Sequence, residues 1–204
     1  MAPLAIACIV EGHGEVQAVP ILIRRIAVTI DPALSIDVKP PLRIPRSKLV
    51  RDKELERAVE LATRKTGGRG GVLILIDSDD DCPAELGPKL LERARTSRGD
   101  LPIGVVLAKR EFEAWFLASA ESIRGKRGLP NDLSPPSDPE SIRGAKEWIA
   151  RRMTGATTYI ETLDQAALAA SFDLQTAAQK SDSFDKCFRE ITSLIQSLHQ
   201  RHKV

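Results

Sequence analysis

Three short apolar runs, each ending abruptly in polar or glycine-containing sequence, organise the pattern along the chain. They span residues 4–10, 72–76 and 103–107. Each run is too short for an independent helix and too uniformly apolar for a half-exposed strand, so each predicts a buried strand of a parallel sheet. Residues 35–38, just before a proline-rich turn, fit a further short strand.

Helical spacing of apolar positions separates these strands. From Glu15 onward, Val16, Val19, Ile23 and Ile26 recur at the spacing of one helical face. An apolar helix is expected after residue 108, and the other predicted helices span residues 52–65, 84–95, 139–153, 161–170 and 183–200. This alternation predicts an α/β fold, in which a mostly parallel sheet of about four strands is flanked by helices and followed by a helical C-terminal extension.

A change in composition predicts where the organisation of the chain changes. Residues 125–139 are rich in Gly, Pro, Ser and Asp, which is typical of a loop or linker. We therefore expect an α/β metal-binding domain over residues 1–122, a loop over 123–139, and a helical extension over 140–204 that packs on the domain.

Composition adds few constraints. The 204 residues are 42% hydrophobic and 28% charged, which is ordinary for a globular protein, and the net charge of +2 neither requires nor excludes nucleic acid. The cysteines Cys8, Cys82 and Cys187 have no metal-binding or redox spacing, so reduced thiols are expected. No apolar stretch approaches the roughly 18 residues of a membrane span, and the first run stops at Glu11. We expect a cytoplasmic protein without a signal peptide or membrane partner.

Four carboxylates follow the central apolar run within five residues, in the sequence Asp77-Ser78-Asp79-Asp80-Asp81. Ligand sites of parallel sheets lie at the carboxyl ends of the strands, and clustered oxygen ligands suit Mg²⁺, Mn²⁺ or Ca²⁺. The alternative is a helix cap before Pro83. One cap needs one carboxylate, whereas four like charges repel unless a cation or basic side chain neutralises them.

A second acidic position follows the first apolar run. Glu11 comes directly after this strand, as Asp77 does after the central one, and neighbouring parallel strands would bring the two carboxylates together. Gly12 and Gly14 allow a tight turn with close backbone approach to a ligand. Glu15 has two interpretations, a first-turn acid that stabilises the helix dipole or a further ligand.

Charged residues also follow the third strand. Lys109 and Arg110 are candidates for stabilising transition-state charge, and Glu111 and Glu113 for a further metal ligand. Alternatively, the two acids are first-turn residues and the lysine is a surface residue.

A basic segment precedes the helix predicted over residues 52–65. A solvated loop is the commoner interpretation of such a segment, but basic loops beside an acidic metal site also suit a phosphodiester substrate. Its members are Arg43, Arg46, Lys48, Arg51 and Lys53.

The order of these motifs resembles the Toprim domain of topoisomerases, primases and overcoming-lysogenization-defect nucleases. Val10-Glu11-Gly12-x-x-Glu15 is similar to the nuclease branch, and Asp77-Ser78-Asp79 with Asp81 resembles the later metal-binding motif. This resemblance covers about residues 4 to 120. The sequences around residues 109–115 and 159–184 look like an uncharacterised Toprim-like bacterial family that is often encoded beside an ATPase. Topoisomerase chemistry is not expected, because the only tyrosine lies in the helical tail.

The resemblance implies a Rossmann-like Toprim fold and a nuclease that depends on Mg²⁺ or Mn²⁺ and acts on DNA or RNA, with DNA favoured, in bacterial defence or DNA repair. It implies catalytic roles for Glu11, as an acid/base residue, and for Lys109. The implied metal ligands are Asp77, Asp79, Asp81, Glu15 and Glu113. Arg46, Lys48 and Arg110 are expected to bind substrate.

Two other functions remain open at this point. One is a non-catalytic partner or regulatory module of an associated ATPase. The other is a receiver-like phosphate-transfer domain, which also places acidic residues at strand ends. The sequence predicts no oligomeric state.

Overall fold

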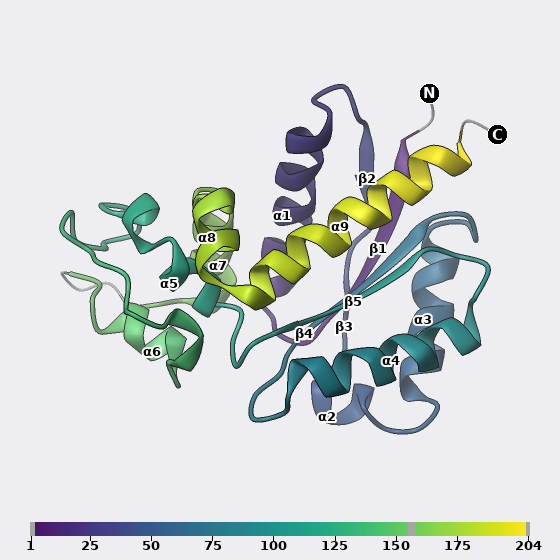
Figure 1. Ribbon diagram of the computed structural model, residues 1–204, viewed down its shortest axis with the longest axis horizontal. Helices are drawn as coiled ribbons and strands as arrows, with labels where there is room; N and C mark the ends of the chain where they lie inside the picture. Colours follow the sequence, from purple (N-terminus) through teal and green to yellow (C-terminus); the bar gives the residue numbers. More distant parts are fainter. Residues whose placement is uncertain (1–2, 155–157, 203–204) are drawn as a thin grey trace.

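A computed structural model describes residues 3–154 and 158–202, and it confirms the predicted α/β fold with a parallel sheet (Figure 1). The strands follow the order β2-β1-β4-β5, and β3 pairs with β1 beyond the end of β2. Their bounds are β1 Leu4–Val10, β2 Ile36–Val38, β3 Leu42–Arg43, β4 Gly71–Asp77 and β5 Ile103–Ala108. The two-residue strand β3 was not predicted, because it is too short to show a periodic pattern.

Helices cover both faces of the sheet. Alternate side chains of β4 point in opposite directions, so Leu73 and Leu75 belong to one buried cluster and Ile74 and Ile76 to another. The first cluster lies under α1 (Glu15–Ile30) and α9 (Asp182–Arg201), and the second under α3 (Glu54–Lys65) and α4 (Pro83–Ser97). Figure 1 shows these two helix layers on opposite sides of the sheet. Burial on both faces explains why the strands are continuous apolar runs.

The sheet has a switch point between β1 and β4. From β1 the chain passes through α1 to β2 on one side, whereas from β4 it passes through α4 to β5 on the other. Val10 of β1 pairs with Leu75 of β4, so Glu11 and Asp77 leave the sheet at the same edge. Chains that diverge in this way leave a crevice beside the carboxyl ends of the two strands, where open α/β folds bind ligands. Strands β1 and β4 are thus neighbours, which is the condition under which Glu11 and Asp77 were expected to lie close together.

The segments after β5 pack against the α/β layers. Helix α9 runs along β5, and α7 lies against α1. The rings of Phe172 and Phe184 lie 5.2 Å apart, and they contact Phe116 and Trp115 respectively, so these aromatic residues pack in the core between the segments. The remaining helical segments are α2 Arg46–Leu49, α5 Ala114–Ala118, η1 Ala120–Ile123, η2 Pro139–Ser141, α6 Ala145–Ala150, α7 Glu161–Ala169 and α8 Leu174–Lys180.

The predicted helix over residues 139–153 is wrong in extent. Residues 139–141 form a short 3₁₀ helix, and α6 begins only after Gly144, whose φ of 72° is left-handed and interrupts a right-handed helix. Helix α8 was not predicted. In the described part of the chain, no helix is both long and apolar enough to cross a membrane.

Candidate functional site

Four carboxylates from three strand ends gather at the edge of the sheet, and we call them the inner carboxylates: Glu11, Glu15, Asp77 and Glu113. The side chains of Glu15 and Glu113 are almost fully buried, with residue exposures of 2% and 0%. The Asp77 carboxylate accepts a hydrogen bond of 2.8 Å from the N–H of Phe112. Glu15 Oε2 accepts bonds from the N–H groups of Glu11, at 2.9 Å, and of the following residue, at 2.8 Å. Glu15 therefore stabilises the turn as a first-turn acid, one of its two predicted roles.

Burial and crowding disfavour the ionised forms of these groups. Burial, followed by the charges of Glu15 and Glu113, holds the pKa of Asp77 well above its usual range. Burial raises the pKa of Glu113 to about 7, and burial together with Asp79 raises that of Glu11. Glu11 Oε2 and Glu113 Oε2 are buried oxygens without a hydrogen-bond partner among the described residues. Such a cluster needs a positive charge.

Lys146 of α6 supplies one positive charge, and the sequence analysis missed it. Its Nζ lies 3.3 Å from Glu161 Oε2. Burial lowers the pKa of Lys146, but the charges of Glu113, Glu161 and Asp77 outweigh burial and leave it above its usual value. No spacing pattern links a residue of this helix to a strand end more than 30 positions earlier, so only packing reveals the neighbourhood.

Two further polar residues of the C-terminal segments hold Glu113. Its Oε1 accepts a bond of 2.8 Å from the hydroxyl of Tyr159 and one of 3.2 Å from Nε2 of Gln165. Both residues lie in the part of the sequence that resembles the Toprim-like bacterial family, but no local pattern predicts their contact with Glu113. Their contacts fix one oxygen of Glu113, while the other has no hydrogen-bond partner within the described part of the chain.

Three more aspartates lie in the loop that follows Asp77 at the end of β4. We call Asp79, Asp80 and Asp81 the outer aspartates. Arg46 Nη1 lies 3.4 Å from Asp79 Oδ2, and Arg46 Nη2 contacts Asp81 Oδ2. Asp80 Oδ1 lies 3.3 Å from Arg110 Nη1 and 2.6 Å from Arg143 Nη2. The predicted acidic cluster is thus neutralised by arginines from three different segments.

The helix-cap interpretation of these aspartates is wrong. Helix α4 begins at Pro83, as expected for proline in the first turn, but its N-cap residue is Cys82. No side chain makes a capping hydrogen bond at this helix start. The carboxylates therefore face arginines rather than backbone amides.

Lys109 and Lys48 lie away from both acidic groups. Lys109 Nζ is 3.8 Å from Glu140 Oε2, and Lys48 Nζ is 3.8 Å from Glu54 Oε2. Within residues 3–154 and 158–202, no hydrogen bond or ion pair joins either lysine side chain to an inner carboxylate or an outer aspartate. The catalytic role of Lys109 and the substrate role of Lys48 stay predictions.

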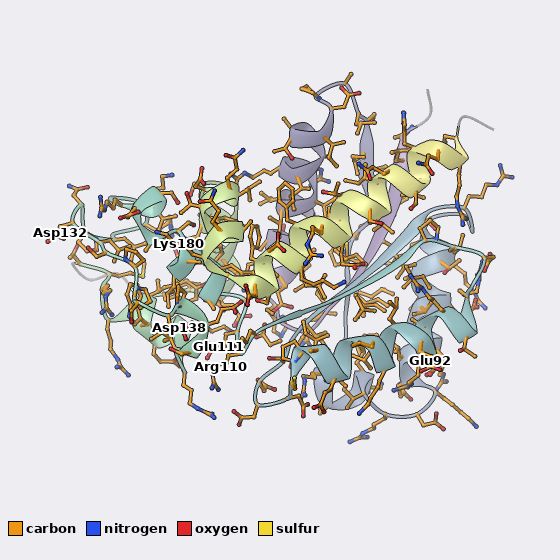
Figure 2. All side chains as sticks on the ribbon, viewed as in Figure 1. Glu92, Arg110, Glu111, Asp132, Asp138 and Lys180 are labelled. Carbon is orange, nitrogen blue, oxygen red and sulfur yellow. The ribbon has the colours of Figure 1, made fainter. Side chains whose placement is uncertain are left out.

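The site extends from the sheet edge onto the C-terminal segments. Figure 2 shows Arg110 and Glu111 where the loop after β5 meets these segments, while Glu92 lies far away on α4. Glu111 accepts backbone bonds from Gly144, at 2.8 Å, and from Lys146, at 3.2 Å. These bonds anchor the start of α6, and a role of Glu111 as a metal ligand stays a prediction.

The donor chemistry of the site fits a hard divalent cation. All candidate ligands are carboxylates, and one buried oxygen on Glu11 and one on Glu113 have no hydrogen-bond partner among the described residues. In the described ranges, no three or more His, Cys, Asp or Glu side chains are grouped closely enough to hold a metal ion. In this structure, the arginines and Lys146 supply the positive charges that face the carboxylates.

Packing leaves no room for a side chain at Gly14. A Cβ at this position would lie 2.2 Å from Gln165 Oε1 and 2.7 Å from the carbonyl oxygen of Glu161. We expect Gly14→Ala to reduce the free energy of unfolding by about 1–3 kcal/mol through overpacking. Gly87→Ala is the control, because its Cβ meets only Leu107 Cδ1 at 3.6 Å inside a helix. Urea unfolding of both variants tests this, and equal stability losses would contradict it.

Comparisons with known proteins identify a family but no activity. A search of curated proteins and a search of solved structures each found no significant match. A family model described as Domain of unknown function (DUF4276) matches residues 10–192. The matched range contains both acidic groups, the three arginines and Lys146. The chain therefore belongs to the DUF4276 family.

Proposed function

We propose that this protein is a Toprim-like nuclease that hydrolyses phosphodiester bonds of nucleic acid, DNA in preference to RNA, with Mg²⁺ or Mn²⁺ as cofactor. One observation carries the proposal. Carboxylates from three strand ends meet at the switch point of a parallel sheet, with mutual repulsion that raises the pKa of Asp77 and with unpartnered buried oxygens on Glu11 and Glu113. Structural stability alone does not account for such an arrangement, because it is costly without a cation.

Asp77 and Asp79 are the residues that would hold the metal ion. A divalent cation there would supply Lewis-acid stabilisation of the charge that develops on the phosphate oxygens. Glu11, which follows β1 at the same edge of the sheet as Asp77, would take the proton of the attacking water. Arg46 contacts both Asp79 and Asp81, and its Nη1 would exchange Asp79 for a substrate phosphate if Asp79 bound the cation.

The test is a cleavage assay with supercoiled DNA and with a short RNA in Mn²⁺, Mg²⁺ or EDTA. We expect nicking of DNA in Mn²⁺ or Mg²⁺, weaker cleavage of RNA, and none in EDTA. Absence of metal-dependent cleavage on both substrates would reject the nuclease.

A non-catalytic partner module of an ATPase is the second candidate. It is favoured by the pairing of the outer aspartates with arginines, and by the lack of a ready-made group of three metal ligands among the described residues. Tight binding to a co-purifying ATPase, with no cleavage by either component in Mn²⁺, would support this function. A receiver-like activity has no such supporting contact.

A further inference from the structure

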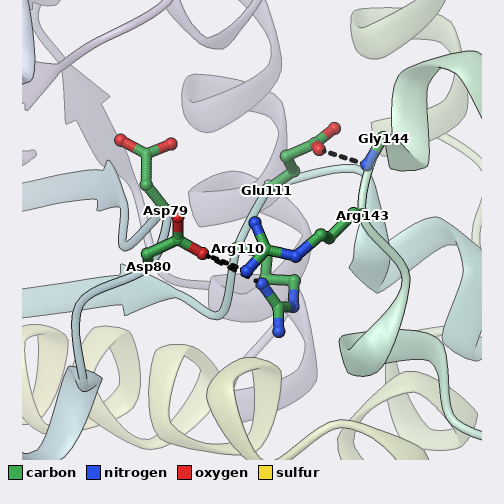
Figure 3. A pocket seen from close by; sticks show the side chains of 6 residues that line it. All are labelled: Asp79, Asp80, Arg110, Glu111, Arg143 and Gly144. Carbon is green, nitrogen blue, oxygen red and sulfur yellow. Dashed lines mark hydrogen bonds and ion pairs between the residues drawn. The ribbon is translucent and has the colours of Figure 1, made fainter.

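Two arginines converge on one exposed carboxylate beside the acidic site. Arg143 Nη2 lies 2.6 Å and Arg110 Nη1 lies 3.3 Å from the same oxygen, Asp80 Oδ1. They line a pocket of about 250 Å³, together with Asp79, Glu111 and Gly144. Figure 3 shows both guanidinium groups approaching Asp80 from one side of this pocket. The side chains of Asp80 and Arg143 are 71% and 70% exposed, so solvent reaches this pair freely.

The backbones that carry the two arginines are fixed, although their contact with Asp80 is exposed. Arg110 has a left-handed φ of 65°, and its N–H donates a bond of 2.9 Å to Ser78 Oγ. Its carbonyl accepts a bond of 3.2 Å from the N–H of Asp79. Arg143 directly precedes Gly144, whose N–H donates to Glu111 (Figure 3). The left-handed conformation of a non-glycine residue is maintained by these contacts against an intrinsic cost of about 1 kcal/mol or more.

The ion pairs of Asp80 with Arg110 and Arg143 are too exposed to stabilise the fold much, so stability does not explain why the two arginine backbones are held in place. Exposed ion pairs contribute about 0–1 kcal/mol. In addition, Arg110 Nε is buried and has no hydrogen-bond partner among the described residues. This donor is available to a ligand. Two planar guanidinium groups that share one oxygen match the oxygens of a phosphate better than a single carboxylate.

We propose that Arg110 and Arg143 bind a phosphodiester group of a nucleic-acid strand, and that Asp80 occupies this site in the free protein as an internal competitor. The identity of the ligand rests on the proposed function. Arg143 comes from the segment before α6, so the substrate site is formed jointly by the sheet edge and the C-terminal segments. The pocket then positions a phosphate next to Asp79, one of the candidate metal ligands.

Binding of a labelled single-stranded DNA oligonucleotide in EDTA tests this without cleavage. We expect Arg143→Ala to weaken binding about tenfold and to reduce the slope of log affinity against log salt by about 0.7, since one phosphate contact is lost. Arg143→Lys should keep that salt slope, because it keeps the charge. Asp80→Asn should tighten binding by up to about fivefold, since it removes an exposed competitor.

A second Arg–Asp pair provides matched controls. Arg98 and Asp100 form a hydrogen-bonded pair 2.8 Å long before β5, at the opposite edge of the sheet. Arg98→Ala and Asp100→Asn should leave both affinity and salt slope unchanged. Circular dichroism checks that every variant is folded.

Three results would overturn the phosphate site: no oligonucleotide binding by the wild-type protein, unchanged binding by Arg143→Ala, or the same gain from Asp100→Asn as from Asp80→Asn. The cleavage assay judges the nuclease separately. A protein that shows this binding pattern and never cleaves DNA in Mn²⁺ keeps the phosphate site and loses the nuclease. If the wild-type protein cleaves DNA but Arg143→Ala binds the oligonucleotide as tightly as wild type, the nuclease is kept and the phosphate site is lost.

Discussion

Asp77→Asn is expected to lower metal-dependent cleavage at least about 100-fold and, at the same time, to raise the melting temperature of the metal-free protein. The loss is on the scale of removing one electrostatic contact to a reacting group. The gain in stability follows from the raised pKa of Asp77, because a neutral amide removes a buried charge that burial and the neighbouring carboxylates disfavour. Asparagine keeps a carbonyl oxygen to accept the 2.8 Å bond from the N–H of Phe112.

Loss of cleavage together with a gain in melting temperature would show that Asp77→Asn impairs activity without impairing folding. Thermal unfolding in EDTA and cleavage in Mn²⁺ are measured on the same preparations. Asp100→Asn, at the opposite edge of the sheet, is expected to keep full cleavage activity. If Asp77→Asn lost activity together with stability, the residue would be a structural one. If activity were unchanged, the proposed metal site would be wrong.

The sheet and half of the site were predictable because both depend on local sequence. A strand buried on both faces is a continuous apolar run, and the residue after such a run must lie at the strand's carboxyl end. Glu11 and Asp77 were therefore placed at one edge of the sheet, and the pairing of Val10 with Leu75 confirms it. Glu113 was ambiguous, since a first-turn acid and a buried ligand have the same local sequence.

The counter-charges could not be predicted. Arg143 and Lys146 reach the site only because Gly144 interrupts the helix expected there and Glu111 anchors the backbone that follows. Neither contact leaves a periodic signal in the sequence. The split between the inner carboxylates, facing Lys146, and the outer aspartates, facing arginines, depends on that tertiary packing. In the sequence, the four aspartic acids between residues 77 and 81 look alike.

The second large effect concerns pH. In EDTA, the free energy of unfolding should fall as pH rises between about pH 5 and about pH 8. Burial raises the pKa of Glu113 from 4.5 to about 7, so in this window the folded state binds more protons than the unfolded state. Stability is then fully present below the unfolded pKa and is lost as pH rises through the folded one. The loss is on the order of 3 kcal/mol, since one pKa unit is worth about 1.4 kcal/mol. Asp77 acts in the same direction.

Urea unfolding at a series of pH values measures this slope. Glu113→Gln should reduce this slope and leave the part that Asp77 and Glu11 contribute, because the amide does not titrate and its oxygen still accepts the bonds from Tyr159 and Gln165. Carboxyls with lowered pKa values, such as Glu56 and Asp100, act below this window, since their stability contribution is lost only as pH falls through the folded value. A wild-type stability that rises steadily from about pH 5 to about pH 8 would contradict the buried, crowded state of the inner carboxylates.

Manganese should reverse this loss. At about 100 times its dissociation constant, a cation that binds only the folded state adds about 2.7 kcal/mol. The gain should be larger at about pH 8 than at about pH 5, because protons compete for the same carboxylates. Asp77→Asn should lose most of the gain, whereas Asp100→Asn should keep it. Equal stabilisation of Asp77→Asn by Mn²⁺ would place the cation elsewhere on the protein. The same crowding that destabilises the metal-free site at high pH is thus what would give a divalent cation its affinity there.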